Sequence, residues 1–126
     1  MMMQRKFILL LTSIFLVSSV SVASAHTVLV SSNPSKGSMI KALPAKITLK
    51  FADPLLILGK RTINRVVVTD PDNFLVTTGV NLVKGAVLTA PLVNVTPITG
   101  TYKVSYRVCA LDGHVVTGSF TFKLQG

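Results

Sequence analysis

The chain has one cysteine, no tryptophan and no glutamate among its 126 residues. The single cysteine, Cys109, excludes an intrachain disulfide, so the stability of the fold must come from a hydrophobic core. We interpret Cys109 as a small buried or half-buried thiol, because free cysteine usually behaves as a small hydrophobe. The alternative is a soft metal ligand, since Cys109 comes shortly before Asp112 in the sequence.

The first 25 residues have the pattern of a secretory signal peptide. Arg5 and Lys6 form a basic start, residues 7–22 are an apolar run, and residues 23–25 read Ala-Ser-Ala, a small-residue cleavage site. We therefore expect residues 1–25 to be removed, which leaves one domain, residues 26–126, without a membrane-spanning segment. The alternative is an uncleaved anchor, but the apolar run of about 16 residues is shorter than the ~20 that span a bilayer.

Acidic residues are scarce, because four aspartates stand against 13 lysines and arginines and the net charge is +9. Nucleic-acid-binding proteins can carry such a charge, but an exported protein does not normally meet nucleic acid, so we expect no nucleic-acid partner. The lysines occur singly along the chain rather than in one block. This spacing favours a solvated basic surface, with weak attraction to anionic lipid or to an acidic partner as the alternative.

Alternating apolar and polar side chains predict β-strands at residues 45–51 and 101–108. Further runs rich in β-branched and aromatic residues are residues 63–69, 74–77, 80–83, 86–90 and 115–124. Turn-forming residues separate these runs, and no segment has the 3.6-residue period of an amphipathic helix. About seven short strands predict an all-β protein, a Greek-key β-sandwich or barrel that is Ig-like with a cupredoxin-like outline.

Both histidines of the chain lie in candidate metal-ligand segments. Cleavage before His26 would let this residue offer a metal two nitrogens, the α-amine and the imidazole Nδ1. The other histidine lies in the tripeptide Asp112-Gly113-His114. Asp-Gly is a strong hairpin-turn signal by itself, but a turn does not explain the adjacent histidine. Nitrogens from His26 and His114 with an oxygen from Asp112 would suit Cu(II), which prefers tetragonal sets of nitrogen and oxygen ligands.

The sequence resembles the CopC family of periplasmic copper-binding proteins over almost the whole of residues 26–126. Residues 26–37 begin with histidine and are similar to the family's start, a histidine followed by L-x-x-S-x-P-x-x-G. Residues 44–51 and 100–107 resemble two of the family's strands. Residues 112–122 match its D-G-H-x-x-x-G-x-x-x-F signature.

This resemblance implies a seven-stranded β-sandwich that binds one Cu(II) ion per chain, with His26, Asp112 and His114 as the copper ligands. It also implies a periplasmic protein of copper resistance or homeostasis that sequesters or transfers copper. The expected partners are the copper ion and an inner-membrane copper importer or another periplasmic copper protein, and the expected state is a monomer.

The sequence departs from the family pattern at three places. Ala110 stands where the family usually has serine before the D-G-H turn. Asp53 stands where relatives often have glutamate near the copper, so it either supports a ligand histidine or simply opens an Asp-Pro turn. Some family members add a methionine-rich Cu(I) site. Met39 is the only methionine after residue 25, and residues 69–80 contain neither methionine nor histidine, so we expect no Cu(I) site here.

Two other function classes remain open. Copper held by an N-terminal histidine is also the core of enzymes that cleave polysaccharides oxidatively. Such enzymes dock substrate on a broad and often aromatic surface, whereas this chain has no tryptophan and both of its tyrosines lie on one predicted core face. A carboxylate ligand also disfavours cycling to Cu(I), so we do not expect an enzyme. The other class is an Ig-like interaction module that binds no metal. A copper titration distinguishes such a module from a copper-binding protein.

The first prediction concerns the amino group of His26. A version that retains one residue before His26 is expected to bind Cu(II) much more weakly than a version that begins at His26. The reason is that an amide nitrogen would replace the amine, so the chelate ring would be lost. Copper titration of the two versions under identical conditions tests this, and equal affinities would exclude the amino-terminal chelate.

Overall fold

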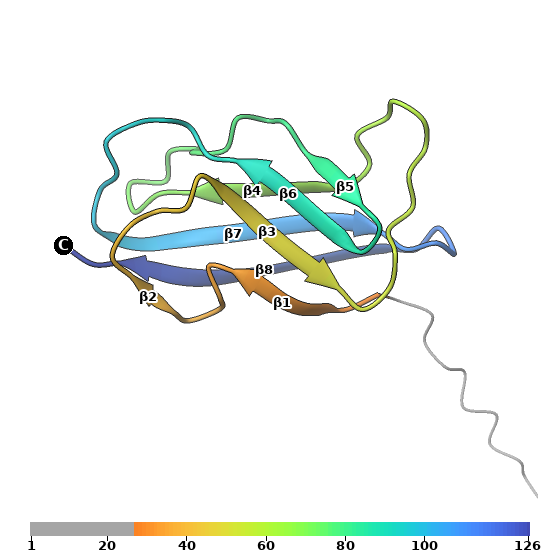
Figure 1. Cartoon of the computed structure of the whole chain (residues 1–126), viewed down its shortest axis with the longest axis horizontal. Helices are drawn as coiled ribbons and strands as arrows, with labels where there is room; N and C mark the ends of the chain where they lie inside the picture. The colour runs from red at the N-terminus through yellow and green to blue at the C-terminus, as the bar shows by residue number, and fades with distance from the viewer. Residues whose placement is uncertain (1–26) are drawn as a thin grey trace, which may run out of the picture.

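The alternating segments of the sequence lie in two four-stranded sheets that pack face to face (Figure 1). The structure is a computed structural model that describes residues 27–126, so His26 and the expected signal peptide lie outside the described residues. The strands are β1 (Leu29–Asn33), β2 (Met39–Ile40), β3 (Lys46–Phe51), β4 (Arg65–Thr69), β5 (Leu82–Lys84), β6 (Val87–Pro91), β7 (Gly100–Cys109) and β8 (Val115–Leu124). No helix in the described part of the chain is long and apolar enough to cross a membrane.

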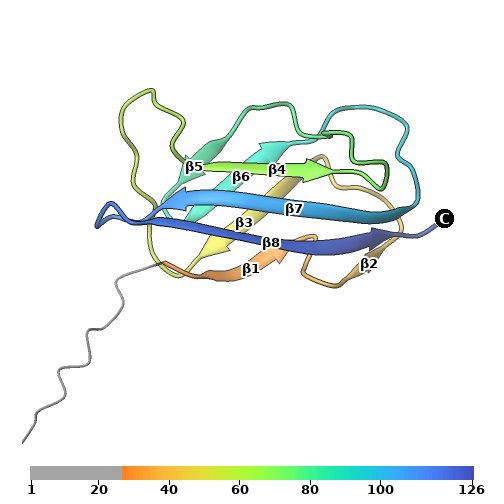
Figure 2. The same ribbon diagram turned by 180° about the vertical axis from the view of Figure 1, so that it is seen from behind.

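The two sheets are interlocked. The first has the strand order β1-β3-β6-β5 and the second β2-β8-β7-β4, which Figure 2 shows from its outer side. Consecutive strands β3 and β4 lie in different sheets, as do β6 and β7, while β3 pairs with β6 and β4 pairs with β7, both antiparallel. This is the connectivity of a Greek-key sandwich, so the predicted fold class is confirmed, with one strand more than expected.

The core lies between the sheets and is built by the alternation that the sequence shows. On β3, Ile47, Leu49 and Phe51 are buried, while Lys46 and Lys50 are exposed. On β7 and β8, Tyr102 and Phe122 stack with their ring centroids 5.3 Å apart. The core therefore consists of aliphatic and aromatic side chains from both sheets, which is the source of stability expected for a chain without disulfides.

The predicted strands are confirmed at residues 45–51, 101–108 and 115–124, which correspond to β3, β7 and β8. The strand predicted at residues 74–77 is wrong. Leu75 and Thr77 form only isolated bridges, to Thr69 and Leu92 respectively. Strands β1 and β2, which pair with β3 and β8, were not among the predicted runs.

Cys109 is 8 % exposed, which confirms the interpretation as a buried thiol. Two hydrogen bonds join its backbone to the connection between β3 and β4. The Leu56 amide donates a hydrogen bond to the Cys109 carbonyl at 2.9 Å. The Cys109 amide donates to Oδ1 of the buried Asn64 at 2.8 Å. These bonds hold the β3–β4 connection against the end of β7.

The hydroxyl of Tyr102 donates a hydrogen bond from within the aromatic core. Its Oη donates a hydrogen bond to the Ile98 carbonyl at 2.7 Å, while the ring is 1 % exposed. Burial raises the pKa of this hydroxyl above its ordinary value of 10.0, and the negative charge of Asp70 raises it further. The folded protein therefore favours the neutral hydroxyl, and ionisation of Tyr102 opposes folding.

Tyr102→Phe is expected to lower the free energy of unfolding at pH 7 by about 1 kcal/mol, the usual net value of one hydrogen bond. The raised pKa means that the stability from the neutral hydroxyl is complete below pH ~10 and is lost as the pH rises through the folded-state pKa. The difference between the two proteins should therefore shrink in alkaline solution. Urea unfolding at pH 7 and at pH 10.5 measures both effects.

Tyr106→Phe is the matched control, because Tyr106 lies on the same strand and its ring packs edge-on against Phe51 at 5.5 Å. We expect the control to lose less stability than Tyr102→Phe. Equal losses would mean that the hydrogen bond to Ile98 contributes nothing specific.

Candidate metal centre

The hairpin between β7 and β8 places Asp112 and His114 at one end of the sandwich. The Ala110 amide donates to the His114 carbonyl at 2.8 Å, and the Gly113 amide donates to the Ala110 carbonyl at 2.9 Å. Gly113 has a φ of +89°, a conformation that side chains of L-residues rarely adopt. The Asp-Gly pair therefore forms the turn that its sequence predicts, and the same turn presents the two candidate ligands.

Asp112 and His114 contact each other through two interactions. The carboxylate Oδ2 of Asp112 lies 2.8 Å from Nδ1 of His114. The other oxygen, Oδ1, accepts a hydrogen bond from the His114 backbone amide at 3.0 Å. The side chain of His114 is 65 % exposed and that of Asp112 is 30 % exposed, so an ion in solution can reach this pair. An oxygen donor and an imidazole are thus held side by side before any metal binds.

His26, the third candidate ligand, lies outside the described residues, but the residue that follows it is well defined. Thr27 is 1 % exposed, and its hydroxyl is hydrogen-bonded to the backbone of Asp53. Figures 1 and 2 show from opposite sides that the described chain begins at the same end of the sandwich as the β7–β8 hairpin. The topology therefore brings the neighbour of His26 to the end that carries Asp112 and His114.

Asp53 lies at this end as well, shortly after β3. The hydrogen bonds that the structure defines for Asp53 are made by its backbone. The Asp53 amide donates to Oγ1 of Thr27 at 3.1 Å. Within residues 27–126, no three side chains of the histidine, cysteine, aspartate or glutamate type form a group that could hold a metal ion. The hairpin supplies two donors, so a complete metal site needs further donors from outside residues 27–126. A role for Asp53 near the metal stays a prediction.

Thr27 is the residue that the sequence analysis missed. Threonine is not a preferred copper ligand, and its partner Asp53 is 26 residues away in the chain, so no local pattern points to the contact.

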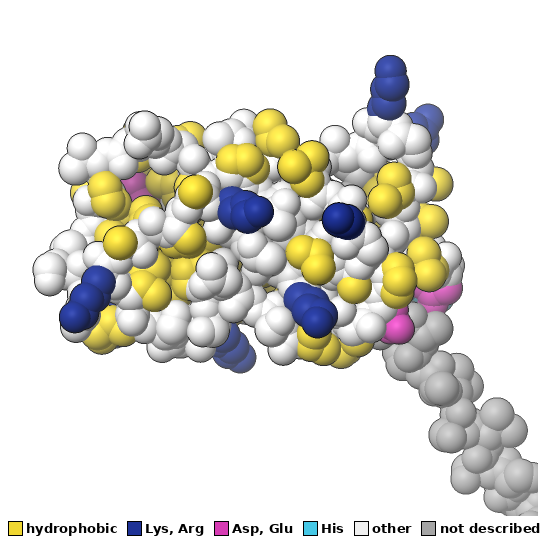
Figure 3. Space-filling view, viewed as in Figure 1, with side chains coloured by type: hydrophobic (Ala, Val, Ile, Leu, Met, Phe, Trp, Pro, Cys, Tyr) yellow, Lys and Arg dark blue, Asp and Glu magenta, His cyan; other side chains and the backbone are white. Residues whose placement is uncertain are grey.

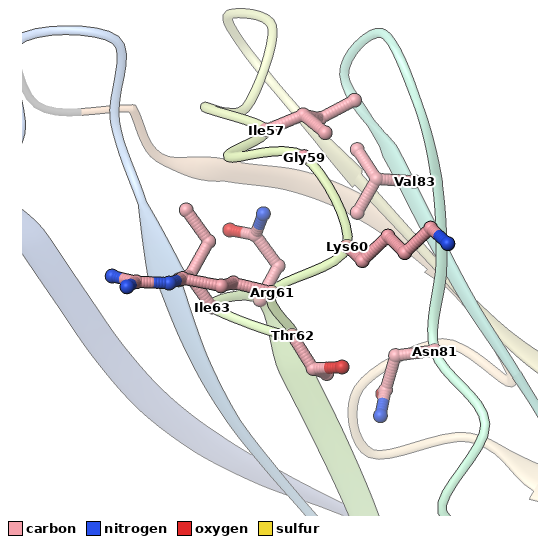
Figure 4. A pocket seen from close by; sticks show the side chains of 9 residues that line it. Ile57, Gly59, Lys60, Arg61, Thr62, Ile63, Asn81 and Val83 are labelled. Atoms are coloured by element: carbon pink, nitrogen blue, oxygen red, sulfur yellow. The ribbon is translucent and has the colours of Figure 1, made fainter.

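A separate cleft of about 160 Å³ lies between the β3–β4 connection and the start of β5 (Figure 4). Lys60, Thr62, Asn81 and Val83 are among the residues that line it. Figure 4 shows Lys60 on the side of Asn81 and Val83, whereas Arg61 points the other way. None of the lining residues is a histidine, cysteine, aspartate or methionine, so the cleft lacks the side chains that bind copper.

The charged side chains agree with a solvated basic surface. Figure 3 shows basic side chains spread singly over the face of β3 and β6, and acidic side chains where the described chain begins. Between described residues, no lysine or arginine forms an ion pair, and the contact of Asp112 with His114 is the one salt-bridge contact, charged on both sides only when His114 is protonated. The lysines and arginines of residues 27–126 are therefore not organised into ion-pair networks.

These features define a small Greek-key β-sandwich with a candidate cation-binding hairpin, and comparisons with known proteins identify its family. The family model described as the CopC domain matches residues 29–125. Copper resistance protein C of Pseudomonas syringae pv. tomato is 34 % identical over 122 residues, which cover 94 % of each chain. The chain therefore belongs to the CopC family, as the sequence motifs predict.

Solved structures agree with this assignment. The crystal structure of CopC from Methylosinus trichosporium OB3b has a TM-score of 0.67 and 25 % sequence identity, covering 79 % of this chain and 94 % of that chain. PcoC, described as a methionine-rich copper resistance protein from Escherichia coli, has a TM-score of 0.63 and 24 % identity, covering 79 % of this chain and 99 % of that chain. PcoC is similar to this chain in fold.

Proposed function

We propose that this protein binds one Cu(II) ion and sequesters or transfers copper in copper resistance or homeostasis. The ligands in this proposal are the α-amine and imidazole of His26, the imidazole of His114 and the carboxylate of Asp112. The amine is available only after cleavage of residues 1–25, so the proposal includes export and a working place in the periplasm. Copper is cargo here, and the protein performs no chemistry on it.

The separation between Nδ1 of His114 and Oδ2 of Asp112 is the observation that carries this proposal. For Zn²⁺, another divalent ion of the first transition row, bonds to imidazole nitrogen and carboxylate oxygen are about 2.0–2.2 Å long. Two such donors at a right angle around one ion lie about 2.8–3.1 Å apart, by simple geometry from those bond lengths. The observed 2.8 Å is a hydrogen bond that falls in this range, so an ion that takes both atoms as ligands replaces the shared proton and needs little further rearrangement of the two side chains.

The donor set also argues for the oxidation state and against catalysis. Imidazole, amine and carboxylate are the nitrogen and oxygen ligands that suit tetragonal Cu(II), whereas Cu(I) selects soft thioether and thiolate ligands. The one cysteine, Cys109, is buried and is not among the proposed ligands. A site of this kind favours holding Cu(II) over cycling between oxidation states.

The named relatives support the biological role. Copper resistance protein C of Pseudomonas syringae pv. tomato covers nearly the same length as this chain. The name of this relative supports copper resistance alone, and our proposal adds that the protein works as a monomer and exchanges copper with an inner-membrane importer or another periplasmic copper protein.

His114→Ala is expected to reduce copper affinity by more than about 100-fold, and Asp112→Ala by about 10- to 100-fold. Substitution of residues that only hydrogen-bond to metal ligands already lowers metal affinity about 10- to 100-fold. Loss of His114 should cost more than loss of Asp112, because imidazole is a better donor to Cu(II) than carboxylate. Both residues are exposed and outside the core, so the melting temperature should hardly change. Competition titration with a copper chelator measures the affinities.

Asp72→Ala is the matched control, because Asp72 is an exposed aspartate of the turn at residues 70–73, away from the β7–β8 hairpin. The control should bind copper like the unchanged protein. If His114→Ala and Asp112→Ala also bind like the unchanged protein, the hairpin is a turn and nothing more.

Copper affinity is also expected to fall steadily as the pH is lowered from 8 to 5. An amine and two imidazoles must be deprotonated to bind the ion, so protons compete with copper for the same donors. Affinity measured across this range, with circular dichroism to follow the fold, checks the expectation. An affinity that does not change with pH would rule out nitrogen donors and the proposed site with them.

A further inference from the structure

Thr27 is a buried polar residue at the point where the described chain enters the sandwich. Its side chain is 1 % exposed, and its Oγ1 interacts with Asp53 in two ways. Oγ1 accepts a hydrogen bond from the Asp53 amide at 3.1 Å and donates one to the Asp53 carbonyl at 3.3 Å. A single hydroxyl therefore engages both backbone groups of a residue 26 positions away.

These bonds extend the pairing of β1 with β3 beyond the ends of both strands. The Ala52 amide donates to the Val28 carbonyl at 2.8 Å, which is the last backbone bond between the two segments. One residue further out, the hydroxyl of Thr27 takes the place of a backbone group. The chain is thereby held against β3 up to residue 27 itself.

The same segment is bonded to the base of the β7–β8 hairpin. Leu55, two residues after Asp53, forms a bridge with Ala110, and the Leu56 amide donates to the Cys109 carbonyl at 2.9 Å. Residues 53–56 thus contact Thr27 at one end and the hairpin base at the other. This short connection sets the position of Thr27 relative to the hairpin tip.

We propose that Thr27 is a positioning residue, whose hydroxyl fixes the start of the chain so that the amine and imidazole of His26 lie near Asp112 and His114. This inference rests on the proposed copper site. Consecutive Cα atoms are about 3.8 Å apart, so the anchored residue is the immediate neighbour of the amine donor. Without the anchor, copper binding would itself have to order this part of the chain, which lowers affinity.

The test uses proteins that begin at His26 and compares Thr27→Val with Thr27→Ser. Valine has nearly the shape of threonine but lacks the hydroxyl, whereas serine keeps it. Thr27→Val is expected to lower Cu(II) affinity about 5- to 30-fold, the factor that corresponds to ordering the backbone of one residue. Thr27→Ser should stay close to the unchanged protein. Without copper, hydrogen exchange of the Asp53 amide should be faster in Thr27→Val only.

Ser32→Ala is the matched control for stability. The Ser32 hydroxyl, in β1, donates to the Pro34 carbonyl at 2.9 Å, so this variant removes a side-chain hydrogen bond further along the same segment and away from the hairpin. It should lower the melting temperature somewhat, because one hydroxyl bond is lost, while copper affinity stays unchanged. An equal loss of copper affinity in Ser32→Ala would mean that Thr27 acts only through stability. Thr27→Ala serves as a second variant if valine prevents folding.

A double-mutant cycle separates positioning from a general effect on the fold. In a protein with one extra residue before His26, the amine donor is absent and Thr27→Val should change copper affinity much less. If Thr27→Val with a free His26 amine binds copper as tightly as the unchanged protein, the positioning role of Thr27 is wrong, while the proposed copper site stands. Failure of the unchanged protein to bind copper would overturn the proposed function, and the role of Thr27 with it.

Discussion

The antiparallel pairing of β7 with β8 is the constraint on which the rest of the structure depends. All ten residues of each strand are in register, from Gly100 opposite Leu124 to Cys109 opposite Val115. Since side chains alternate between the two faces, this register buries Tyr102, Val104, Phe120 and Phe122 and leaves the turn outside the core. A shift by one residue would expose the aromatic core and would also move Asp112 and His114 out of the turn that pairs them.

The second constraint is the end of the sandwich, where parts of the chain distant in sequence meet. The start of β1, the connection after β3 and the β7–β8 hairpin converge there, and backbone hydrogen bonds link each one to the next. Thr27, Asp53 and Leu55 connect the first segment to the hairpin base. Metal ligands held by a rigid framework lose less entropy on binding than ligands on loose segments, so under the proposed function these small contacts contribute to copper affinity.

Sequence patterns predicted the parts of this fold that depend on period-two alternation. Strands β3 and β7 were located almost to the residue from their alternation, and β8 from its richness in β-branched and aromatic residues. Strand β1 was missed because the register shift between Leu29 and Ser31 breaks its period, and β2 because a strand of two residues has none. The Asp112 and His114 pair was predictable because it is local. The contact of Thr27 with Asp53 was not, because only the topology brings residues so far apart in the chain together.

The register of β7 with β8 sets both the core and the hairpin, but the side chains of the two regions differ sharply in burial. Ala110 is 2 % exposed and belongs to the packed interior, whereas Leu111, next in sequence, is 62 % exposed. The boundary between framework and hairpin tip therefore falls between two consecutive residues. Side chains beyond it can differ in chemistry while the interior stays the same, as is common for loops on a rigid scaffold. The buried hydroxyl of Thr27 marks a second boundary of this kind, because its hydrogen bonds to Asp53 hold the first described residue to the framework.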